Sequence, residues 1–299
     1  MSQPPTQKAP GYGEVCSGLR TELHDRGVLL ITLDAPERLN ALDQAMKRDL
    51  IELVTRAQMD DRVRVLVFAG EGRAFCAGDH LGGYHDGAPA SVAKIEGGHT
   101  TAIGTENALR VFSQALNVAV RNLDKLTIAA INGPAIQTGL SLALSCDFRI
   151  GSTLARLGSA TLRFALLPDE GGHVLLVRHL GLAQALDFVL RKRIVDANEA
   201  LRLGLLNEVV EPEALLPAAM ALAVELAEGP QVAMRMLKRS LYVAAESTFA
   251  QALDDIAVRT AVTDHHPDAR DGGRSFREKR APKFNAWLDA TEEKGPPLP

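Results

Sequence analysis

The chain has 299 residues, 46% of them apolar, and a formal net charge of -4. This apolar share supports a sizeable core and excludes global disorder, and the absence of a basic face argues against nucleic-acid binding. Its three cysteines, Cys16, Cys76 and Cys146, are too widely spaced for a disulfide framework or a metal motif, which fits a reducing cytoplasm. No apolar run approaches the roughly 18 residues of a membrane span, so we expect no membrane association.

The first part of the chain alternates strand and helix signals. Val28–Leu33 is a short apolar run followed by a turn, which predicts a buried strand. Apolar residues then recur at helical spacing over 42–57, with Asn40 as the expected N-cap. Residues 63–69 predict a second strand. A parallel strand pair with a crossover helix is therefore expected.

The middle of the chain is more interrupted. Residues 80–104 are polar and weakly patterned and predict a loop, in which His80, His85 and His99 are expected to be solvent-exposed unless they contact substrate. Cys76 and Cys146 lie in apolar stretches and are predicted to be buried, inert thiols. Helices are expected at 106–122, 139–145, 174–180 and 183–190, and strands at Leu126–Ile131, 148–150 and 154–157.

Strand signals vanish after about Pro212. Amphipathic helices are predicted at 213–226, 231–245 and 249–263. The chain is therefore α/β first and all-α at its end. The predicted organisation is a flexible N-terminal arm (1–17), an α/β core (18–212) and a C-terminal helical region (213–299).

Two glycine-bearing loops, residues 74–79 and 132–139, each follow a predicted strand. Open α/β sheets bind ligands at the carboxyl ends of their strands, and glycine lets the backbone come close to a ligand. Two backbone N–H groups from such loops can converge on one oxygen and form an oxyanion hole. Ordinary tight turns are the alternative interpretation of both loops.

Five segments, the first two of which contain these loops, are recognisable: AFCAGDHL (74–81), INGPAIQTGLSLALSCDFRI (131–150), LLPDEGGHVLLVRHLG (166–181), ANEALRLGLLNEVV (197–210) and GGRSFREKRAPKF (272–284). In sequence, order and spacing they resemble the crotonase (enoyl-CoA hydratase/isomerase) superfamily. The resemblance implies an α/β fold, a crotonase-like spiral of ββα units with a C-terminal α-helical region used for oligomerisation. It also implies a homotrimer or dimer of trimers, an acyl-CoA substrate, and no cofactor, since coenzyme A enters as part of the substrate.

By the same resemblance, the oxyanion hole is formed by the backbone N–H groups of Asp79 and Thr138. Such donors stabilise the enolate that forms beside a thioester carbonyl, by about 2.7–4 kcal/mol each. Both positions depart from the usual pattern of the family, which has smaller residues there. Thr138 adds bulk, and Asp79 places a negative charge near the developing anion.

The residues that match the family's catalytic positions favour one reaction. The two glutamates of its hydratases fall at Ser141 and Thr161, which do not titrate near neutral pH. Asp169 falls where several isomerases of the family carry their catalytic acid, and one carboxylate can both remove and return a proton. Its alternative role is to cap the following helix. Glu170 could serve instead but is expected to face another way, and Ser141 is expected to pack between helices.

The resemblance also implies a set of residues that contact coenzyme A. Its basic members would hold the phosphates, because Arg and Lys suit such contacts. The two at the C-terminal end could equally form a solvated basic helix end. The set consists of Arg38, Ala41, Ala74, Ala77, Lys279 and Arg280.

The leading hypothesis is therefore enoyl-CoA double-bond isomerisation with Asp169 as acid and base. A fold does not determine a reaction, so hydration, hydrolysis and decarboxylation of a CoA thioester remain alternatives within the family. A non-catalytic acyl-CoA-binding homologue is the alternative from another class, because neither hydratase glutamate is present. No metal site is expected.

Overall fold

The computed structural model describes Tyr12, residues 18–80 and residues 101–289. Apart from Tyr12, the arm predicted at 1–17 lies outside the described residues, and so do His85 and His99 of the predicted loop. Along the described ranges, no helix combines the length and the apolar composition that a membrane span requires.

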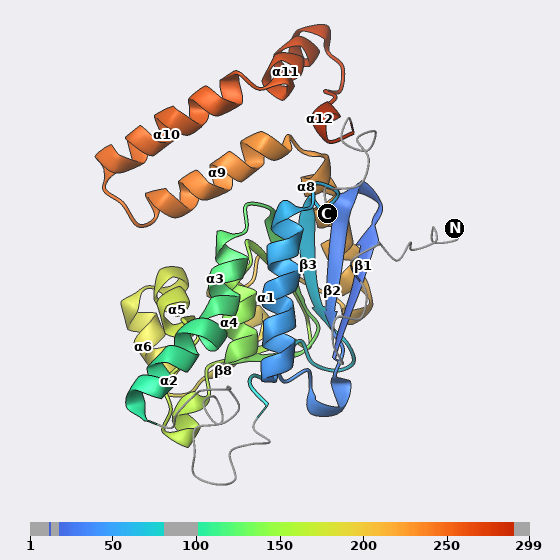
Figure 1. Cartoon of the computed structure of the whole chain (residues 1–299). Coiled ribbons are helices and arrows are strands. Elements are labelled where there is room, and N and C mark those ends of the chain that lie inside the picture. Colours follow the sequence, from blue (N-terminus) through green and yellow to red (C-terminus); the bar gives the residue numbers. More distant parts are fainter. Residues whose placement is uncertain (1–11, 13–17, 81–100, 290–299) are drawn as a thin grey trace.

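A six-stranded sheet forms the centre of the molecule (Figure 1), in the order β1-β2-β3-β4-β6-β9. Only β1 is antiparallel to its neighbour, so the carboxyl ends of the other strands meet at one edge of the sheet. A smaller sheet has the order β5-β7-β8. The strands are β1 (Leu19–His24), β2 (Val28–Leu33), β3 (Val65–Gly70), β4 (Leu126–Ile131), β5 (Pro134–Ile136), β6 (Phe148–Ser152), β7 (Arg156–Gly158), β8 (Ile194–Asp196) and β9 (Glu208–Val210).

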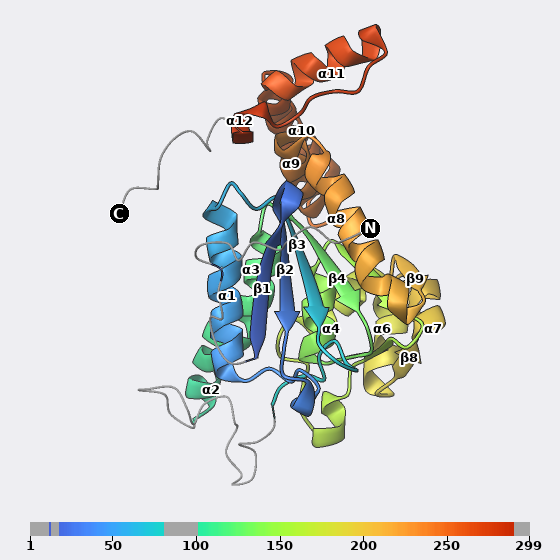
Figure 2. The same ribbon diagram turned by 90° about the vertical axis from the view of Figure 1, so that its right-hand side faces the viewer.

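Helices cover both faces of the large sheet (Figure 2), with α1 and α3 on one side and α8 on the other. The helices are α1 (Gln44–Met59), α2 (Ala102–Ala108), α3 (Gln114–Asn122), α4 (Thr138–Ser145), α5 (Gly172–Leu180), α6 (Leu182–Leu190), α7 (Ala197–Arg202), α8 (Leu215–Glu228), α9 (Gln231–Ala244), α10 (Phe249–Asp264), α11 (Pro267–Glu278) and α12 (Ala286–Asp289). A π-helical turn, Leu109–Ser113, separates α2 from α3.

Alternate residues of the central strands enter two separate cores. In β2, Leu29 and Ile31 pack on the α1 side, and Val28 and Leu30 pack on the α8 side. Successive side chains of a strand point to opposite faces, so a strand buried on both faces is apolar throughout. This explains why the unbroken run of β2 predicted its bounds correctly. The parallel pairing of β2 with β3 is also confirmed.

The start of α1 differs from the sequence-based prediction. Asp43 is the N-cap, and its side chain accepts a hydrogen bond from the Met46 N–H. Asn40 instead lies buried in the loop after β2, where its Nδ2 donates to the carbonyls of Glu71 and Ala74 at 2.9 and 2.8 Å. Asparagine bridges loops as readily as it caps helices, and sequence alone does not distinguish the two. The predicted cap was wrong, but Asn40 joins the loop after β2 to the loop after β3.

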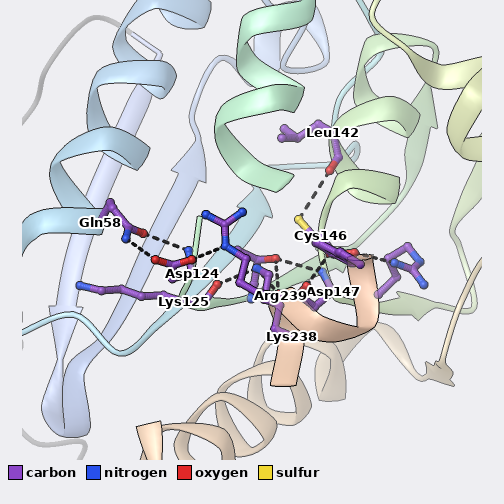
Figure 3. A network of polar contacts seen from close by, with 11 residues as sticks. Gln58, Asp124, Lys125, Leu142, Cys146, Asp147, Lys238 and Arg239 are labelled. Atoms are coloured by element: carbon purple, nitrogen blue, oxygen red, sulfur yellow. Dashed lines mark hydrogen bonds and ion pairs between the residues drawn. The ribbon is translucent and has the colours of Figure 1, made fainter. Parts of the chain in front are cut away.

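A buried ion pair attaches α9 to the body of the molecule (Figure 3). Lys238 of α9 donates from Nζ to Asp147 Oδ2 at 2.8 Å and to the carbonyl of Lys125 at 2.8 Å. Tyr242, one turn further along α9, donates its hydroxyl to Asp147 Oδ1 at 2.7 Å. Helices α9, α10 and α11 lie beyond the end of the sheet that is opposite the carboxyl edge of β2 and β3 (Figures 1 and 2).

The three-part division of the chain stays a prediction. Strand β9 is the last strand of the described part of the chain, and the residues after Pro212 form helices. The first of them, α8, packs as a layer on the large sheet through Ala219, Ala223 and Ala227. The later helices α10 and α11 lie further out (Figure 1).

Candidate active site

A cavity of about 630 Å³ opens at the carboxyl edge of the parallel strands. Its walls come from four segments: the loop after β3, the stretch from α2 to the start of α3, the turn between β5 and α4, and the stretch from a short 3₁₀ helix, η5 (Thr161–Phe164), to the start of α5. These segments bring together polar residues from distant parts of the sequence, among them Asp79, Gln137, Thr138, Thr161, Asp169 and Glu170.

Backbone hydrogen bonds hold the first two segments side by side. The Cys76 N–H donates to the carbonyl of Pro134 at 3.0 Å, and the Ile136 N–H donates to the carbonyl of Cys76 at 2.9 Å. At Gly139 a Cβ atom would lie 2.2 Å from the Cys76 carbonyl oxygen, so only glycine permits this approach. Gly78 has a φ of +111°, which again favours glycine. The two glycine-bearing loops therefore pack against each other and are not separate surface turns.

The two predicted oxyanion residues, Asp79 and Thr138, both line this cavity. Thr138 is the first residue of α4, and the first N–H groups of a helix have no partner within the helix. Within the described ranges, no acceptor is found for the N–H of Asp79 or of Thr138. Gln137, which precedes Thr138, has φ 49° and ψ −106°, a strained conformation of the kind that clusters at active sites. Their role as an oxyanion hole stays a prediction that this placement allows.

The carboxylate of Asp79 has a buried counter-ion that the sequence analysis missed. Lys47 of α1 places Nζ 2.8 Å from Asp79 Oδ2 and 3.4 Å from Ser113 Oγ. A sequence signal was present, because Lys47 falls within the apolar stripe of α1, next to Met46 and one turn before Leu50. A lysine in such a stripe is buried and needs a partner. Lys47 thus balances the negative charge that Asp79 brings to the site.

Thr138 connects Asp79 to Glu170. Its Oγ1 lies 2.6 Å from Asp79 Oδ1 and 2.5 Å from Glu170 Oε1. Glu170 also accepts a hydrogen bond from Gln137 Nε2 at 3.1 Å, and its backbone carbonyl is held by Asn117 Nδ2 at 2.9 Å. The expectation that Glu170 faces another way was wrong. Glu170 is buried, and its carboxyl group belongs to the same cluster as Asp79.

Asp169 lies next to Glu170 in the wall of the cavity. Burial, followed by the charges of Glu170 and Asp79, raises the pKa of Asp169 to about 7, and the charge of Lys47 acts in the opposite direction. Asp169 is not the N-cap of α5, since Gly171 occupies that position without a side-chain hydrogen bond. A carboxyl group that titrates near neutrality can take and return a proton.

The two positions that match the hydratase glutamates contribute no acid. Ser141 is buried between α4 and α5, where its Oγ would lie 2.4 Å from a Cβ atom on Gly172, so it packs between helices as predicted. Thr161 lines the cavity, but its hydroxyl donates to Gln137 Oε1 at 3.3 Å. Its role there is to orient the Gln137 amide, which in turn donates to Glu170.

The chain is similar to proteins that carry out related reactions. Residues 24–286 match the family model described as enoyl-CoA hydratase/isomerase. The chain belongs to the enoyl-CoA hydratase/isomerase family. It is 32% identical to the 1,2-epoxyphenylacetyl-CoA isomerase of Escherichia coli over 87% of this chain and 95% of that protein. It is 31% identical to the (E)-benzylidenesuccinyl-CoA hydratase of Thauera aromatica over 86% of this chain and 95% of that protein.

Solved structures of the family have the same fold. The enoyl-CoA hydratase of Mycobacterium smegmatis superposes with a TM-score of 0.81 at 28% identity, over 89% of this chain and 98% of that one. The predicted α/β crotonase fold is therefore confirmed. The names of the relatives include both isomerases and hydratases, so membership of the family leaves the reaction to be argued from the site.

The residues expected to contact coenzyme A are only partly brought together. Ala77 lines the cavity, and Ala41 and Ala74 lie buried in the adjoining loops. Arg38 pairs with Asp43 at 3.0 Å. The other two basic residues lie far from these.

Lys279 and Arg280 are exposed at the end of α11, which lies at the opposite end of the molecule from the carboxyl edge of the sheet (Figure 1). Arg280 pairs there with Asp271 at 2.6 Å. A single chain therefore does not bring Lys279 and Arg280 to its own cavity. In this family member they can serve coenzyme A only at a neighbouring copy, and that role stays a prediction.

The two cysteines of the described core are buried, as predicted. Burial raises the pKa of Cys76 and of Cys146 to about 12, so both thiols stay protonated and unreactive at neutral pH. His80 is exposed. None of these residues supplies a nucleophile or a base to the cavity.

Proposed function

We propose that this family member isomerises the double bond of an enoyl-CoA thioester, with Asp169 as the group that moves the proton. One observation carries the proposal: a carboxyl group with a pKa near neutrality lines the same cavity as two backbone N–H groups that lack an acceptor. Ser141 and Thr161, at the positions of the two hydratase glutamates, carry no titratable group.

The reaction proceeds in two proton transfers. The Asp169 carboxylate takes a proton from C2 of a 3-enoyl-CoA, and the electron pair of the broken C–H bond moves toward the thioester oxygen. The N–H groups of Asp79 and Thr138 stabilise the resulting enolate. Asp169 then returns the proton to C4, the carbonyl re-forms, and the double bond lies between C2 and C3. General acid–base catalysis of this kind contributes about 10²–10⁴-fold in rate.

Hydration is the second candidate, and the position of Glu170 favours it. Hydration needs one group to orient water and another to deliver a proton. Glu170 and Asp169 are adjacent carboxyl groups in the same wall, so together they offer two acids where the family's glutamate positions offer none. Isomerisation is preferred because Glu170 is already bonded to Thr138 and Gln137 and buried away from free water.

A direct assay distinguishes the two reactions. Purified protein is offered 3-enoyl-CoA and 2-enoyl-CoA separately, while the absorbance of the conjugated thioester and the mass of the product are followed. Conversion of the 3-enoyl to the 2-enoyl form without a gain of water is the expected result. Addition of water to the 2-enoyl form would replace our proposal by hydration. Binding of both thioesters without turnover would mean a non-catalytic acyl-CoA binder.

We also propose that the chain assembles into a homotrimer or a dimer of trimers in the cytoplasm. Large apolar side chains on α9 and α10 support the assembly, because Leu237, Leu241, Phe249 and Val258 are exposed in the single chain. Sedimentation equilibrium measures the mass directly. A monomer at micromolar concentration would contradict the proposal and would leave Lys279 and Arg280 without a neighbouring site.

A further inference from the structure

The segment that carries Asp169 has no regular secondary structure of its own. Residues 165–171 lie between η5 and α5 and form neither a helix nor a strand. A reactive group on such a segment needs support from neighbouring elements, because sites on loops are placed less precisely than sites on helices and strands. Three consecutive backbone carbonyls of this segment, those of Pro168, Asp169 and Glu170, each contact the nitrogen of a side chain at hydrogen-bond distance.

Two of these nitrogens belong to amide side chains of α3. Gln114 Nε2 donates to the carbonyl of Asp169 at 3.2 Å. Asn117 Nδ2 donates to the carbonyl of Glu170 at 2.9 Å. Residues three positions apart lie on the same face of a helix, so one face of α3 holds both carbonyls. Asn117 is itself fixed, because it is buried and its Oδ1 accepts a hydrogen bond from Ser145 Oγ at 3.3 Å.

The third nitrogen lies at the start of α5. His173 Nδ1 is 2.8 Å from the carbonyl oxygen of Pro168, and because a carbonyl oxygen can only accept, this nitrogen carries the hydrogen. The peptide groups on both sides of the Asp169 Cα are therefore held, one by His173 and the other by Gln114. Because a peptide group is planar, holding both of them fixes the backbone dihedral angles of Asp169. Its carboxyl group can then move only by rotation about the bonds of its own side chain.

A π-helical turn directly before α3 sets the direction of the two amides. Leu109–Ser113 form this turn, and Gln114 is the next residue. A π-helical turn holds one residue more than an α-helical turn, and one residue corresponds to a rotation of roughly 100° about the helix axis. The extra residue therefore helps to determine which face of α3 is turned toward the segment before α5. Turns of this kind are frequent at functional sites, and Leu109 also lines the cavity.

Amides are donors that suit the surroundings of a base. An amide donates a hydrogen bond without carrying a charge. A lysine or arginine at position 114 could also hold the carbonyl, but its charge would favour the ionised form of Asp169 and lower the pKa of that carboxyl group. Gln114 and Asn117 therefore hold the backbone in place without this effect on the acid that it carries.

We propose that the side chains of Gln114, Asn117 and His173 form a clamp that places the proposed base for proton transfer. The three are positioning residues that hold the backbone and exchange no proton with the substrate, and the inference rests on the proposed isomerisation. The Asp169 carboxyl group has to reach first C2 and then C4 of one bound substrate. A reactive group that is about 1 Å out of place can cost about 10²-fold in rate, so releasing the segment should slow the reaction.

Two variants of His173 distinguish holding the backbone from transferring a proton. His173→Asn places an amide nitrogen at the position of Nδ1, because both nitrogens are bonded to Cγ, whereas His173→Leu places a methyl group there. Both variants lack the imidazole. Turnover of 3-enoyl-CoA should stay close to that of wild type in His173→Asn and fall about tenfold in His173→Leu. An equal loss in both would mean that the imidazole itself acts on the substrate, and this would overturn its assignment to the clamp.

Variants of α3 test the other two members of the clamp. Gln114→Met and Asn117→Leu keep side chains of similar size but lack the donor, so kcat should fall about 10- to 100-fold, while the dissociation constant of butanoyl-CoA, a saturated thioester, stays unchanged. Gln114 is only half-buried, so its variant should fold even if that of Asn117 does not.

Gln231→Met is the matched control for these variants. The amide of Gln231, at the start of α9, holds the carbonyls of Leu226 and Ala227. Its loss should lower the stability of the protein and leave kcat unchanged. Wild-type kcat in Gln114→Met would overturn the clamp, and so would an equal loss of kcat in Gln231→Met.

A measurement on the free protein keeps the clamp testable if the isomerisation itself is absent. Carbon-13 NMR follows the titration of the Asp169 carboxyl group, whose signal is identified by its loss in Asp169→Asn. Gln114→Met changes none of the charged or titratable groups that face this carboxyl group. These groups are Asp79, Glu170, Lys47 and His173.

The titration has a definite expected outcome. Burial is the main cause of the raised pKa of Asp169, and a released segment lets the carboxyl group reach water. The midpoint should therefore move from about 7 toward the ordinary value of an aspartate in Gln114→Met and stay unchanged in Gln231→Met. An unchanged midpoint in Gln114→Met would overturn the clamp, whatever reaction the protein catalyses. Failure of wild type to convert 3-enoyl-CoA would instead overturn the proposed function, and the titration would still decide the clamp.

Discussion

Within the described residues, two pairs formed by a buried lysine and an aspartate have the same N–O distance but lie in different regions. Lys47 and Asp79 meet at the cavity, and Lys238 and Asp147 attach α9 to the body of the molecule (Figure 3). In both pairs the lysine residue is 5% exposed and the N–O distance is 2.8 Å. The aspartate side chains differ: that of Asp147 is 10% exposed and that of Asp79 is 40% exposed.

The partners of the two aspartates explain their different behaviour. Asp147 accepts hydrogen bonds from the Thr127 N–H at 2.8 Å, the Thr127 hydroxyl at 2.9 Å and the Tyr242 hydroxyl at 2.7 Å. These donors hold its carboxylate in one position. Asp79 shares its hydroxyl partner, Thr138, with a second carboxyl group and faces a cavity. Asp147 therefore has several donors of its own and a structural role, whereas Asp79 shares one hydroxyl with a second carboxyl group and faces the cavity, where chemistry can take place.

The largest effect on turnover is expected from replacing Asp169, which lines the same cavity as Asp79. Asp169→Asn keeps the shape of the side chain but cannot take a proton, so turnover of 3-enoyl-CoA should fall by about 10²–10⁴-fold. Asp254→Asn, an exposed aspartate of α10, is the control and should retain wild-type turnover. Steady-state kinetics measure both. Full activity in Asp169→Asn would remove Asp169 from the mechanism.

The Lys238–Asp147 pair should contribute more to the stability of the folded protein than the Lys47–Asp79 pair. Lys238→Met leaves Asp147 buried without its cation, and breaking a buried pair in this way costs about 3–5 kcal/mol. Lys47→Met should cost clearly less, because the more exposed Asp79 carboxylate regains contact with water. Urea unfolding of the two variants compares their free energies of unfolding. Equal losses would mean that the exposure of the carboxylate does not separate the two pairs.

Because the pKa of Asp169 is raised, replacing its carboxylate by an uncharged group should stabilise the folded protein above neutral pH. The folded protein binds this proton more tightly than the unfolded chain, so raising the pH from about 4 to about 7 lowers the free energy of unfolding. Asp169→Asn should therefore be more stable than wild type at pH 8, by about 1–3 kcal/mol, and little different at pH 4. Thermal unfolding at the two pH values tests this. A variant that is less stable at pH 8 would contradict the raised pKa.

The smallest effect should appear in the pH dependence of the reaction. Asp169 must be ionised to accept a proton, so kcat/KM of wild type should decline as the pH drops below about 7. The charge of Lys47 lowers the pKa of Asp169, so Lys47→Met should move this decline upward by up to about one pH unit. Lys238→Met, far from the cavity, should leave the midpoint of the decline unchanged. A shift in both variants would point to a general change in the protein.

Much of the fold and part of the candidate site could be predicted from local patterns. Val28–Leu33 and Leu126–Ile131 coincide with β2 and β4, because strands buried on both faces are unbroken apolar runs. The short strands β5, β8 and β9, of three residues each, were missed because three residues are too few to show the alternating pattern of a strand. The placement of Asp79, Thr138 and Asp169 around one cavity followed from the resemblance to a family.

The sequence by itself determined the α/β class, the two glycine-bearing loops and the presence of two acids before α5, because period, turn residues and motif spacing are local properties of the chain. Only the tertiary structure decided that Lys47 meets Asp79, that Asn40 bridges loops, and that Glu170 turns toward Thr138. These contacts join residues from 32 to 34 positions apart. Their energies depend on burial and on the exact positions of donors and acceptors, which exist only once the segments have packed together.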